Sequence, residues 1–198
     1  MRVFHREHAG RPLRAAWALE EAGQDYEVVK MTTEEGRGPE HRERHPLGKV
    51  PVLEDDTGYV FESAAIVMHV ADSFPQAGLI PPVGSHERAL VYQWVLYGPA
   101  EMEPPLIESA MYAQADPERA EKARRRFDER AAAVAALLEQ REFLVGEAFT
   151  VADIMVGSAV KFTARIGFAQ ELPDSLQDYM KRLSSRPAYE RALARTRD

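Results

Sequence analysis

The sequence predicts an α/β domain followed by an all-α domain. Short strand-like apolar runs alternate with helical patterns only in the first 74 residues, and from Glu87 onward apolar residues recur at helical spacing alone. Between the two regions, residues 76–86 (QAGLIPPVGSH) are rich in proline and glycine, which is typical of a linker. We therefore expect domains at 1–75 and 87–198, joined by a linker at 76–86.

The first domain is expected in the order β-α-β, a loop, then β-β-α. Its predicted elements are a strand at 2–5, a helix at 12–22, a strand at 25–31, a loop at 32–48 with a short helix near 40–44, strands at 50–54 and 59–61, and a helix at 63–74. Pro12 suits a first helical turn, Gly23 a helix end, and Asp55–Gly58 a hairpin turn. Ser63 is the expected N-cap of the last helix. A helix between the first two strands implies that these strands are parallel.

The second domain is expected to contain helices only. They are predicted at 88–97, 117–140, 150–167, 175–183 and 187–194. The helix at 150–167 is apolar almost all round, which is typical of a buried central helix. Thr150 and Asp153 at its start fit a capping box. The run Arg124–Arg126 is interpreted as the solvated face of the long helix.

Composition excludes several classes of function. The 198 residues carry 25 Lys and Arg against 32 Asp and Glu, a net charge of −7, which argues against nucleic acid as a partner. Cysteine is absent, so thiol nucleophiles, disulfides and cysteine-ligated metals are excluded. No apolar run is long enough for a membrane span or a signal peptide, which predicts a cytoplasmic protein without a membrane partner. No metal site is expected, since His41 and His45 have helical spacing but no visible third ligand.

Two segments are open to a structural and a functional interpretation. The Val50–Pro51 bond is either an ordinary trans start to a strand or a cis bond that turns the Val50 backbone outward, where it could pair with an extended peptide-like ligand. Glu62 and Ser63 either begin a helix and no more, or form an anion site in which Glu62 takes a ligand's ammonium group.

The chain resembles a cytosolic glutathione transferase over its whole length. The segments that carry the resemblance are Arg14–Gly23, Pro46–Pro51, Phe61–Ile66, Leu79–Pro82, Phe149–Asp153 and Arg186–Tyr189. Their order and spacing together are specific, although each is weak by itself. The resemblance implies a thioredoxin-like first domain that holds glutathione as co-substrate, an all-α second domain, and a homodimer.

The resemblance also implies which residues contact glutathione. It places a cis-proline at Pro51, pairs the Val50 backbone with the cysteinyl group, and assigns the γ-glutamyl ammonium and carboxylate to Glu62 and Ser63. Gly10 and Lys49 complete the predicted glutathione-binding set.

The sequence departs from the family at the reactive position. The family places a Tyr, Ser or Cys near the start of the first helix, whereas residues 1–25 of this chain contain no hydroxyl and no thiol. Cationic candidates for stabilising the glutathione thiolate remain, namely Arg11 and His8, together with backbone N–H groups near Gly10 and the positive end of the first helix.

The first functional hypothesis is therefore a detoxifying enzyme that activates the glutathione thiol for attack on a small hydrophobic electrophile. This electrophile is expected between the domains, and candidate wall residues are Tyr97, Met102, Met111 and Tyr112, which plain helix packing explains equally well. Two alternatives stay open. One is a non-catalytic glutathione-binding or regulatory protein, and the other is a glutathione-dependent isomerase or hydrolase.

Overall fold

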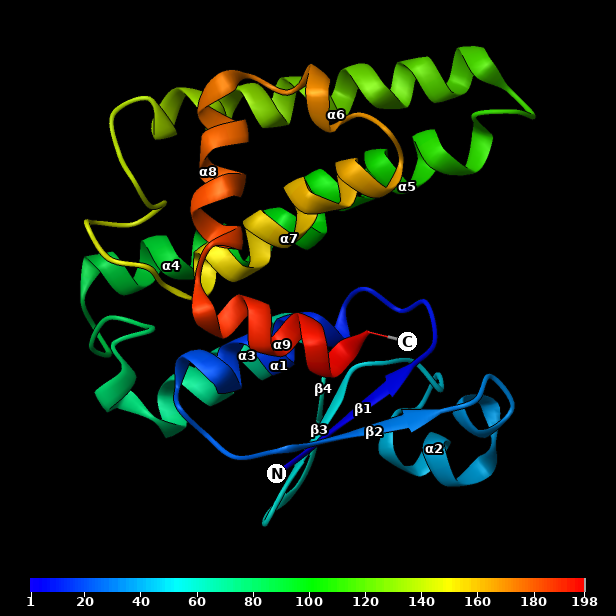
Figure 1. Ribbon diagram of the computed structural model, residues 1–198, viewed down its shortest axis with the longest axis vertical. Helices are drawn as coiled ribbons and strands as arrows, with labels where there is room; N and C mark the ends of the chain where they lie inside the picture. The colour runs from blue at the N-terminus through cyan, green and yellow to red at the C-terminus, as the bar shows by residue number, and fades with distance from the viewer. Residues whose placement is uncertain (198) are drawn as a thin grey trace. The chain divides into compact units, whose positions relative to one another are not determined.

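The computed structural model describes residues 1–197, which form two compact units. The first unit contains Met1–Ile80 together with the residues from Ser185 onward, and the second contains Pro81–Ser184. Figure 1 labels the helices and strands of both units. The predicted second domain ran to 198, so the structure differs in assigning the last helix to the first unit.

A four-stranded mixed sheet forms the centre of the first unit. Its strands are β1 (Arg2–Arg6), β2 (Glu27–Met31), β3 (Val52–Asp55) and β4 (Gly58–Phe61). They are arranged in the order β2-β1-β3-β4, with β1 parallel to β2 and the other two pairs antiparallel. The predicted parallel crossover and the predicted hairpin are both confirmed.

The helices of the first unit lie against this sheet. They are α1 (Pro12–Glu21), α2 (Pro39–Arg44), α3 (Ser63–Ser73) and α9 (Pro187–Thr196), with 3₁₀ turns η1 (Glu35–Arg37) and η2 (Pro75–Ala77). Helices α1, α3 and α9 lie together on one side of the sheet, and α2 lies apart from them (Figure 1). The side chain of Phe4 on β1 lies 6.1 Å from the ring of His41 on α2, so α2 covers the sheet face that carries Phe4.

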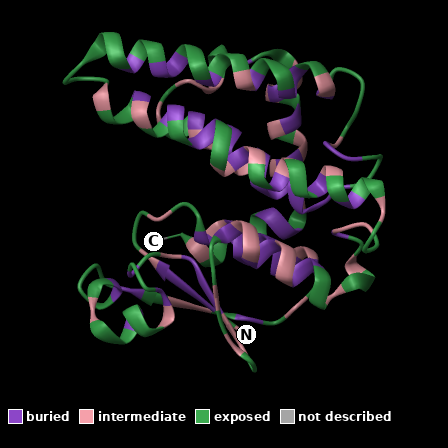
Figure 2. Ribbon diagram, turned by 180° about the vertical axis from the view of Figure 1, so that it is seen from behind, coloured by how far each residue is buried: buried purple, intermediate pink, exposed green. Residues whose placement is uncertain are grey.

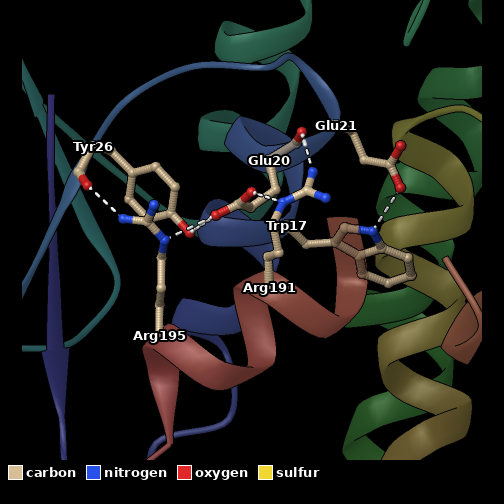
Figure 3. A network of polar contacts seen from close by, with 6 residues as sticks. All are labelled: Trp17, Glu20, Glu21, Tyr26, Arg191 and Arg195. Carbon is tan, nitrogen blue, oxygen red and sulfur yellow. Dashed lines mark hydrogen bonds and ion pairs between the residues drawn. The ribbon is translucent and has the colours of Figure 1, made fainter. Parts of the chain in front are cut away.

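Ion pairs hold α9 against α1 (Figure 3). The carboxylate of Glu20 accepts a hydrogen bond from Arg191 Nε at 2.6 Å and one from the Tyr26 hydroxyl at 3.1 Å, and it pairs with Arg195 Nε at 3.0 Å. Burial and the neighbouring carboxylate of Glu20 raise the pKa of the Tyr26 hydroxyl, which therefore stays protonated as a donor.

The next residue of α1 repeats this pattern. Glu21 accepts two hydrogen bonds from Arg186, at 2.6 and 2.8 Å, and a third from Trp17 Nε1 at 2.9 Å. The rings of Trp17 and Tyr189 meet edge to face at 4.9 Å. These contacts are the physical reason why the last helix belongs to the first unit, since bidentate arginine–carboxylate pairs are the strong form of such hydrogen bonds.

The second unit contains helices and no strands among its described residues. It contains α4 (His86–Tyr97), a π-helical turn η3 (Gly98–Met102), α5 (Glu103–Tyr112), α6 (Pro117–Leu138), α7 (Val151–Arg165), the 3₁₀ turn η4 (Ala169–Glu171) and α8 (Asp174–Ser184). No residue ranges were predicted for η3 and α5. No helix of the described residues has both the length and the apolar character that a membrane span requires.

Helix α7 is the buried centre of this unit, as predicted, and its start is closed by its own side chains. Figure 2 colours the chain by burial, with buried residues in purple. The capping box is present: the Thr150 N–H donates to Asp153 Oδ2 at 2.8 Å. Asp153 has no exposed surface and also accepts from the Leu144 N–H at 3.0 Å and the Tyr179 hydroxyl at 2.9 Å.

The predicted solvated face of α6 is wrong for one of its three arginines. Arg125 and Arg126 are exposed, but Arg124 is buried. Its guanidinium lies 4.1 Å from the centre of the Phe168 ring and pairs with Asp128 and Glu171 at 2.8 and 3.2 Å. A charge run in sequence does not reveal which member points toward a ring on another element.

Candidate functional site

The start of α3 is joined to α1 by a buried hydrogen bond. Arg14 Nη1 donates to Ser63 Oγ at 3.1 Å, and both side chains are buried. Because Ser63 Oγ accepts this bond, its own hydrogen remains available as a donor to something else. The first intrahelical bond of α3 runs from the Ile66 N–H to the Glu62 carbonyl at 2.9 Å, so the preceding N–H groups have no acceptor within the helix.

Ser63 is the first residue of α3 and not its N-cap, which corrects the prediction. The N-cap is Glu62, and neither it nor Ser63 makes a side-chain capping bond to the helix. The physical reason lies in the backbone, because Glu62 is the last residue with non-helical dihedral angles, while the Ser63 hydroxyl accepts from Arg14. Glu62 is exposed and has a left-handed backbone with φ of 69°.

Left-handed backbone marks two predicted segments. Among the described residues, His8 (φ 61°) and Glu62 are the non-glycine residues with positive φ. Such conformations cost about 1–3 kcal/mol and concentrate at functional sites, where surrounding structure holds them in place. One lies between β1 and α1, and the other lies at the start of α3.

The turn before β3 holds the Val50–Pro51 bond, which is cis. Val50 is half-buried and its side chain packs on the cluster of Phe4, Met31 and Val52. Two histidines of the α2 segment hold the turn: His41 Nε2 lies 2.8 Å from the Lys49 carbonyl oxygen, and His45 Nδ1 accepts from the Leu47 N–H at 3.1 Å.

Gly48 is required in this turn. Its φ is 59°, and a Cβ built on it would lie 2.7 Å from the carbonyl oxygen of Gly36. A side chain at this position would therefore push the turn away from η1. The Gly48 N–H donates to the His45 carbonyl at 2.8 Å, which closes the turn.

His45 itself is buried next to the start of α3. Its ring lies 4.7 Å from that of Phe61. Burial lowers the pKa of the His45 imidazole, and the negative charge of Glu62 opposes this shift. The turn before β3 and the start of α3 are thus neighbours.

The segment between β1 and α1 is exposed. His8, Gly10 and Arg11 are all exposed, and Arg11 is the N-cap of α1 without a side-chain capping bond. Pro12 follows at the first helical position and has no N–H to offer. The positive charge at the start of α1 therefore comes from a small number of backbone N–H groups and from the Arg11 side chain.

Helices α1 and α3 share an electrostatic feature. Neither has an acidic residue in its first turn, and the nearest acid at α3 is its exposed N-cap, Glu62. The other α-helices of the described chain each have one: Glu40, Glu87, Glu103, Glu118, Asp153, Asp174 and Glu190. The two exceptions are the helix starts that contain residues predicted to bind glutathione or to stabilise its thiolate.

The predicted hydrophobic residues of the second unit have different environments. Met102 has no exposed surface and belongs to the helical core, so plain packing accounts for it. Met111 is 69% exposed, Tyr112 lies under the Arg119 guanidinium at 3.7 Å, and the Tyr97 hydroxyl donates to the Arg130 carbonyl at 3.3 Å. These four side chains do not share one environment.

Two residues of the site were not predicted. Arg14 was quoted only as part of a motif, although an arginine among Ala15, Ala16 and Trp17 is a signal of a buried cation that needs a partner. His41 was weighed as a metal ligand, whereas the structure gives it a backbone carbonyl. Within residues 1–197 no group of three or more His, Asp or Glu side chains could hold a metal ion.

Comparison with known proteins identifies the family. The family model "Glutathione S-transferase, N-terminal domain" matches residues 1–72, and "Glutathione S-transferase, C-terminal domain" matches residues 88–187. The chain is 44% identical over 96 residues to Glutathione S-transferase 4 of Zea mays, covering 48% of this chain and 43% of the relative. It thus spans less than half the length of the maize relatives that it matches.

Two further proteins match almost end to end. Glutathione S-transferase GstA of Escherichia coli O157:H7 is 25% identical over 201 residues, which cover 98% of each chain. The solved structure of a sphingomonad glutathione S-transferase complexed with glutathione has a TM-score of 0.84 at 29% identity, again covering 98% of each chain. The thioredoxin-like first domain and the helical second domain that the resemblance implied are confirmed, and this chain belongs to the glutathione S-transferase family.

Proposed function

We propose that this protein is a glutathione transferase that lowers the thiol pKa of bound glutathione and directs the thiolate at a small hydrophobic electrophile. In this proposal Ser63 and Glu62 hold the γ-glutamyl end, the Val50 backbone beside Pro51 pairs with the cysteinyl group, and Lys49 and Gly10 border the ligand. The solved relative with bound glutathione supports the choice of thiol.

The observation that carries the proposal is the pair of helices, α1 and α3, whose first turns contain no acidic residue. Glutathione transfer requires two anions to be held at once, namely a γ-glutamyl carboxylate and a thiolate. The first turns of α3 and α1 contain no acid that would compete with a ligand anion, and the two helix starts are linked by the bond from Arg14 to Ser63. A charge-assisted hydrogen bond from the Ser63 hydroxyl to the carboxylate would contribute about 1.5–3 kcal/mol.

Arg11 is the proposed group that stabilises the thiolate, with His8 in a lesser role. A free thiol has a pKa of about 8.5, which a neighbouring cation or a helix start lowers. The thiol proton goes to solvent, the thiolate sulfur forms a bond to the electrophilic carbon, and a leaving group departs with the bonding electrons. Arginine stays charged at all relevant pH values, whereas histidine must be protonated to act in this way.

The proposal further includes a role in detoxification, a cytoplasmic location and a homodimer. The electrophile would contact exposed side chains of the second unit, such as Met111. Tyr97 and Tyr112 are further candidates, while Met102 would have to move to reach a ligand.

A second candidate function is favoured by the exposed, hydroxyl-free segment that contains Gly10 and Arg11. A protein that binds glutathione without turnover, or that uses it as cofactor for isomerisation, would keep the α3 site and would not need a hydroxyl there. Binding alone predicts affinity without consumption of any thiol, and isomerisation predicts turnover without loss of free thiol.

A thermal-shift panel of small cellular thiols tests the binding part. A ligand at about 100 times its Kd stabilises the folded protein by about 2.7 kcal/mol, which raises the melting temperature of a chain of this size by roughly 5–10 °C. The proposal expects this rise with glutathione. A rise with a different thiol only would identify another co-substrate and refute the γ-glutamyl assignment.

Rate measurements of Arg11→Ala against pH test the catalytic part. We expect slower conjugation near neutral pH and recovery in alkaline buffer, where the thiol ionises without help. His8→Ala should have a smaller effect, and Arg141→Ala removes an exposed arginine of the second unit as the control. Profiles of Arg11→Ala and wild type that superimpose would remove Arg11 from the mechanism.

A further inference from the structure

We infer that His41 is a positioning residue for glutathione binding, which aims the backbone N–H of Val50 at the ligand by holding the neighbouring Lys49 carbonyl. This inference rests on the proposed function. The observations that carry it are the contact between His41 Nε2 and the Lys49 oxygen at 2.8 Å, the complete burial of His41, and the geometry of one peptide group.

The hydrogen bond determines which ring nitrogen of His41 carries the hydrogen. A carbonyl oxygen only accepts hydrogen bonds, so His41 Nε2 must be the nitrogen that carries the hydrogen. The other nitrogen, Nδ1, is buried and has no hydrogen-bond partner among the described residues. A hydrogen on Nδ1 would be a buried donor without an acceptor, which agrees with the same assignment.

The Lys49 carbonyl and the Val50 N–H belong to the same peptide group. Among the described bonds the cis peptide is Val50–Pro51, so the Lys49–Val50 bond is trans. In a planar trans peptide the C=O and N–H bonds point in opposite directions. Because His41 has no exposed surface, the bond to it turns the Lys49 carbonyl inward and the Val50 N–H outward.

The rest of the surroundings leaves this peptide group little freedom. The Val50 side chain packs on the cluster that contains Phe4, and the ring of His41 lies 6.1 Å from the same Phe4 ring. On the other side, the Gly48 N–H is bonded to the His45 carbonyl. Val50 also precedes β3, which begins at Val52, so its N–H lies outside the sheet's hydrogen-bond ladder.

His41 therefore acts on the ligand through the backbone and does not touch it. Without the donor on Nε2, the peptide group between Lys49 and Val50 can rotate, and the Val50 N–H loses its fixed direction. Glutathione must then order this group when it binds. One hydrogen bond of this kind corresponds to roughly a fivefold to tenfold rise in the Kd for glutathione.

Two variants of opposite design test this role. His41→Leu places an apolar side chain against Phe4 and removes the donor. His41→Gln instead provides an amide donor near the position of Nε2. We expect the Kd for glutathione, measured by calorimetry, to rise roughly fivefold to tenfold in His41→Leu and to stay within about twofold of wild type in His41→Gln. His86→Leu, an exposed histidine of the second unit, is the control for loss of a histidine.

An amide resonance separates positioning from a structural role. In the wild type, saturating glutathione should shift the ¹H–¹⁵N signal of Val50, and this shift should shrink in His41→Leu at saturation while the shifts of Ala64 and Ala65 persist. In the conjugation assay, KM for glutathione should rise while kcat stays within about twofold.

The outcomes are distinguishable. If the wild type does not bind glutathione, the proposed function is refuted and this inference with it. If the wild type binds and His41→Leu has an unchanged Kd, or His41→Gln is no better than His41→Leu, only the inference is refuted. Should His41→Leu fail to fold, the wild-type spectrum still decides, because a Val50 amide that does not respond to bound glutathione overturns the inference.

Discussion

The starts of α7 and α3 differ in how acceptors are provided for their unpaired backbone N–H groups. Each helix begins with N–H groups that have no acceptor inside the helix. At α7 the chain supplies the acceptors itself, because the Thr150 hydroxyl accepts from the Ala152 N–H and the buried carboxylate of Asp153 accepts from the Thr150 N–H. At α3 there is no acid in the first turn and no side-chain cap, and the serine hydroxyl is directed by Arg14.

This difference separates a helix start that is closed by its own side chains from one that, in the proposed function, receives a ligand. The acceptor of α7 is internal, so its contribution is stability. The acceptor of α3 is expected to be an external carboxylate, so its contribution is affinity. Variants at the two starts should therefore change different measurements.

The largest effect is expected from Asp153→Ala. It leaves the Leu144 N–H, the Thr150 N–H and the Tyr179 hydroxyl without their buried acceptor. We expect the free energy of unfolding, measured with chemical denaturant, to fall by about 3–4 kcal/mol. Asp174→Ala removes an exposed acid from the first turn of α8 and should cost less than about 1 kcal/mol. Equal losses in the two variants would contradict the internal role of Asp153.

Ser63→Ala should act on affinity first. It removes the proposed donor to the γ-glutamyl carboxylate, and calorimetry should show the Kd for glutathione rising at least tenfold. Because Ser63 does not cap α3, the free energy of unfolding should fall by no more than about 1–2 kcal/mol, from the acceptor that Arg14 loses. Ser73→Ala, at the other end of the same helix, is the control. An unchanged Kd in Ser63→Ala would place the ligand elsewhere.

Ala65→Glu adds an acid at the third residue of α3, the position that Asp153 has in α7. The added carboxylate offsets the helix dipole and should stabilise the fold by about 0.3–1 kcal/mol. It should also repel the ligand carboxylate, so we expect the Kd for glutathione to rise roughly fivefold over that of Ala65→Gln, which has the same shape without the charge. The repulsion should weaken with added salt, since salt screens exposed charges. A Kd equal to that of Ala65→Gln would remove the anion site from α3.

The smallest effect concerns Lys161, toward the other end of α7. Burial lowers the pKa of its ammonium group to about 8. Between pH 8 and the ordinary value of about 10.5 this group binds fewer protons in the folded than in the unfolded state, so the contribution of Lys161 to stability should rise with pH in this range. Lys161→Met should be more stable than wild type by about 1 kcal/mol below pH 8, after allowance for solvent screening, and the difference should vanish near pH 10.5. A difference that does not depend on pH would contradict this cause.

Local patterns predicted much of the fold, whereas the candidate site residues come mainly from the resemblance and stay predictions. The parallel crossover, the hairpin, the buried α7 and its capping box follow from short-range signals such as apolar periodicity and the spacing of Thr150 and Asp153. The wrong and missing details depend on partners far along the chain. Ser63 was assigned as an N-cap because the sequence does not show that the Ser63 oxygen accepts a hydrogen bond from Arg14, 49 positions earlier.

The same limit applies to His41 and to the last helix. A histidine pair at helical spacing suggests metal ligands, and only the folded turn shows that His41 meets the Lys49 carbonyl. The helix from Pro187 was assigned to the second domain by its position in the sequence. Its arginines instead pair with carboxylates of α1 that precede them by more than 160 positions.

The pairing of α9 with α1 also has a consequence for biosynthesis. Glu21 and Arg186 are separated by 165 positions, and Glu20 and Arg191 by 171. A ribosome releases Glu20 and Glu21 early, then synthesises all of Pro81–Ser184, and only then delivers the arginines that neutralise them. The part of the protein that is made first is thus finished last. A nascent chain that stalls before Arg186 would carry two uncompensated acids on α1, which a protease that removes incomplete chains could distinguish from the mature fold.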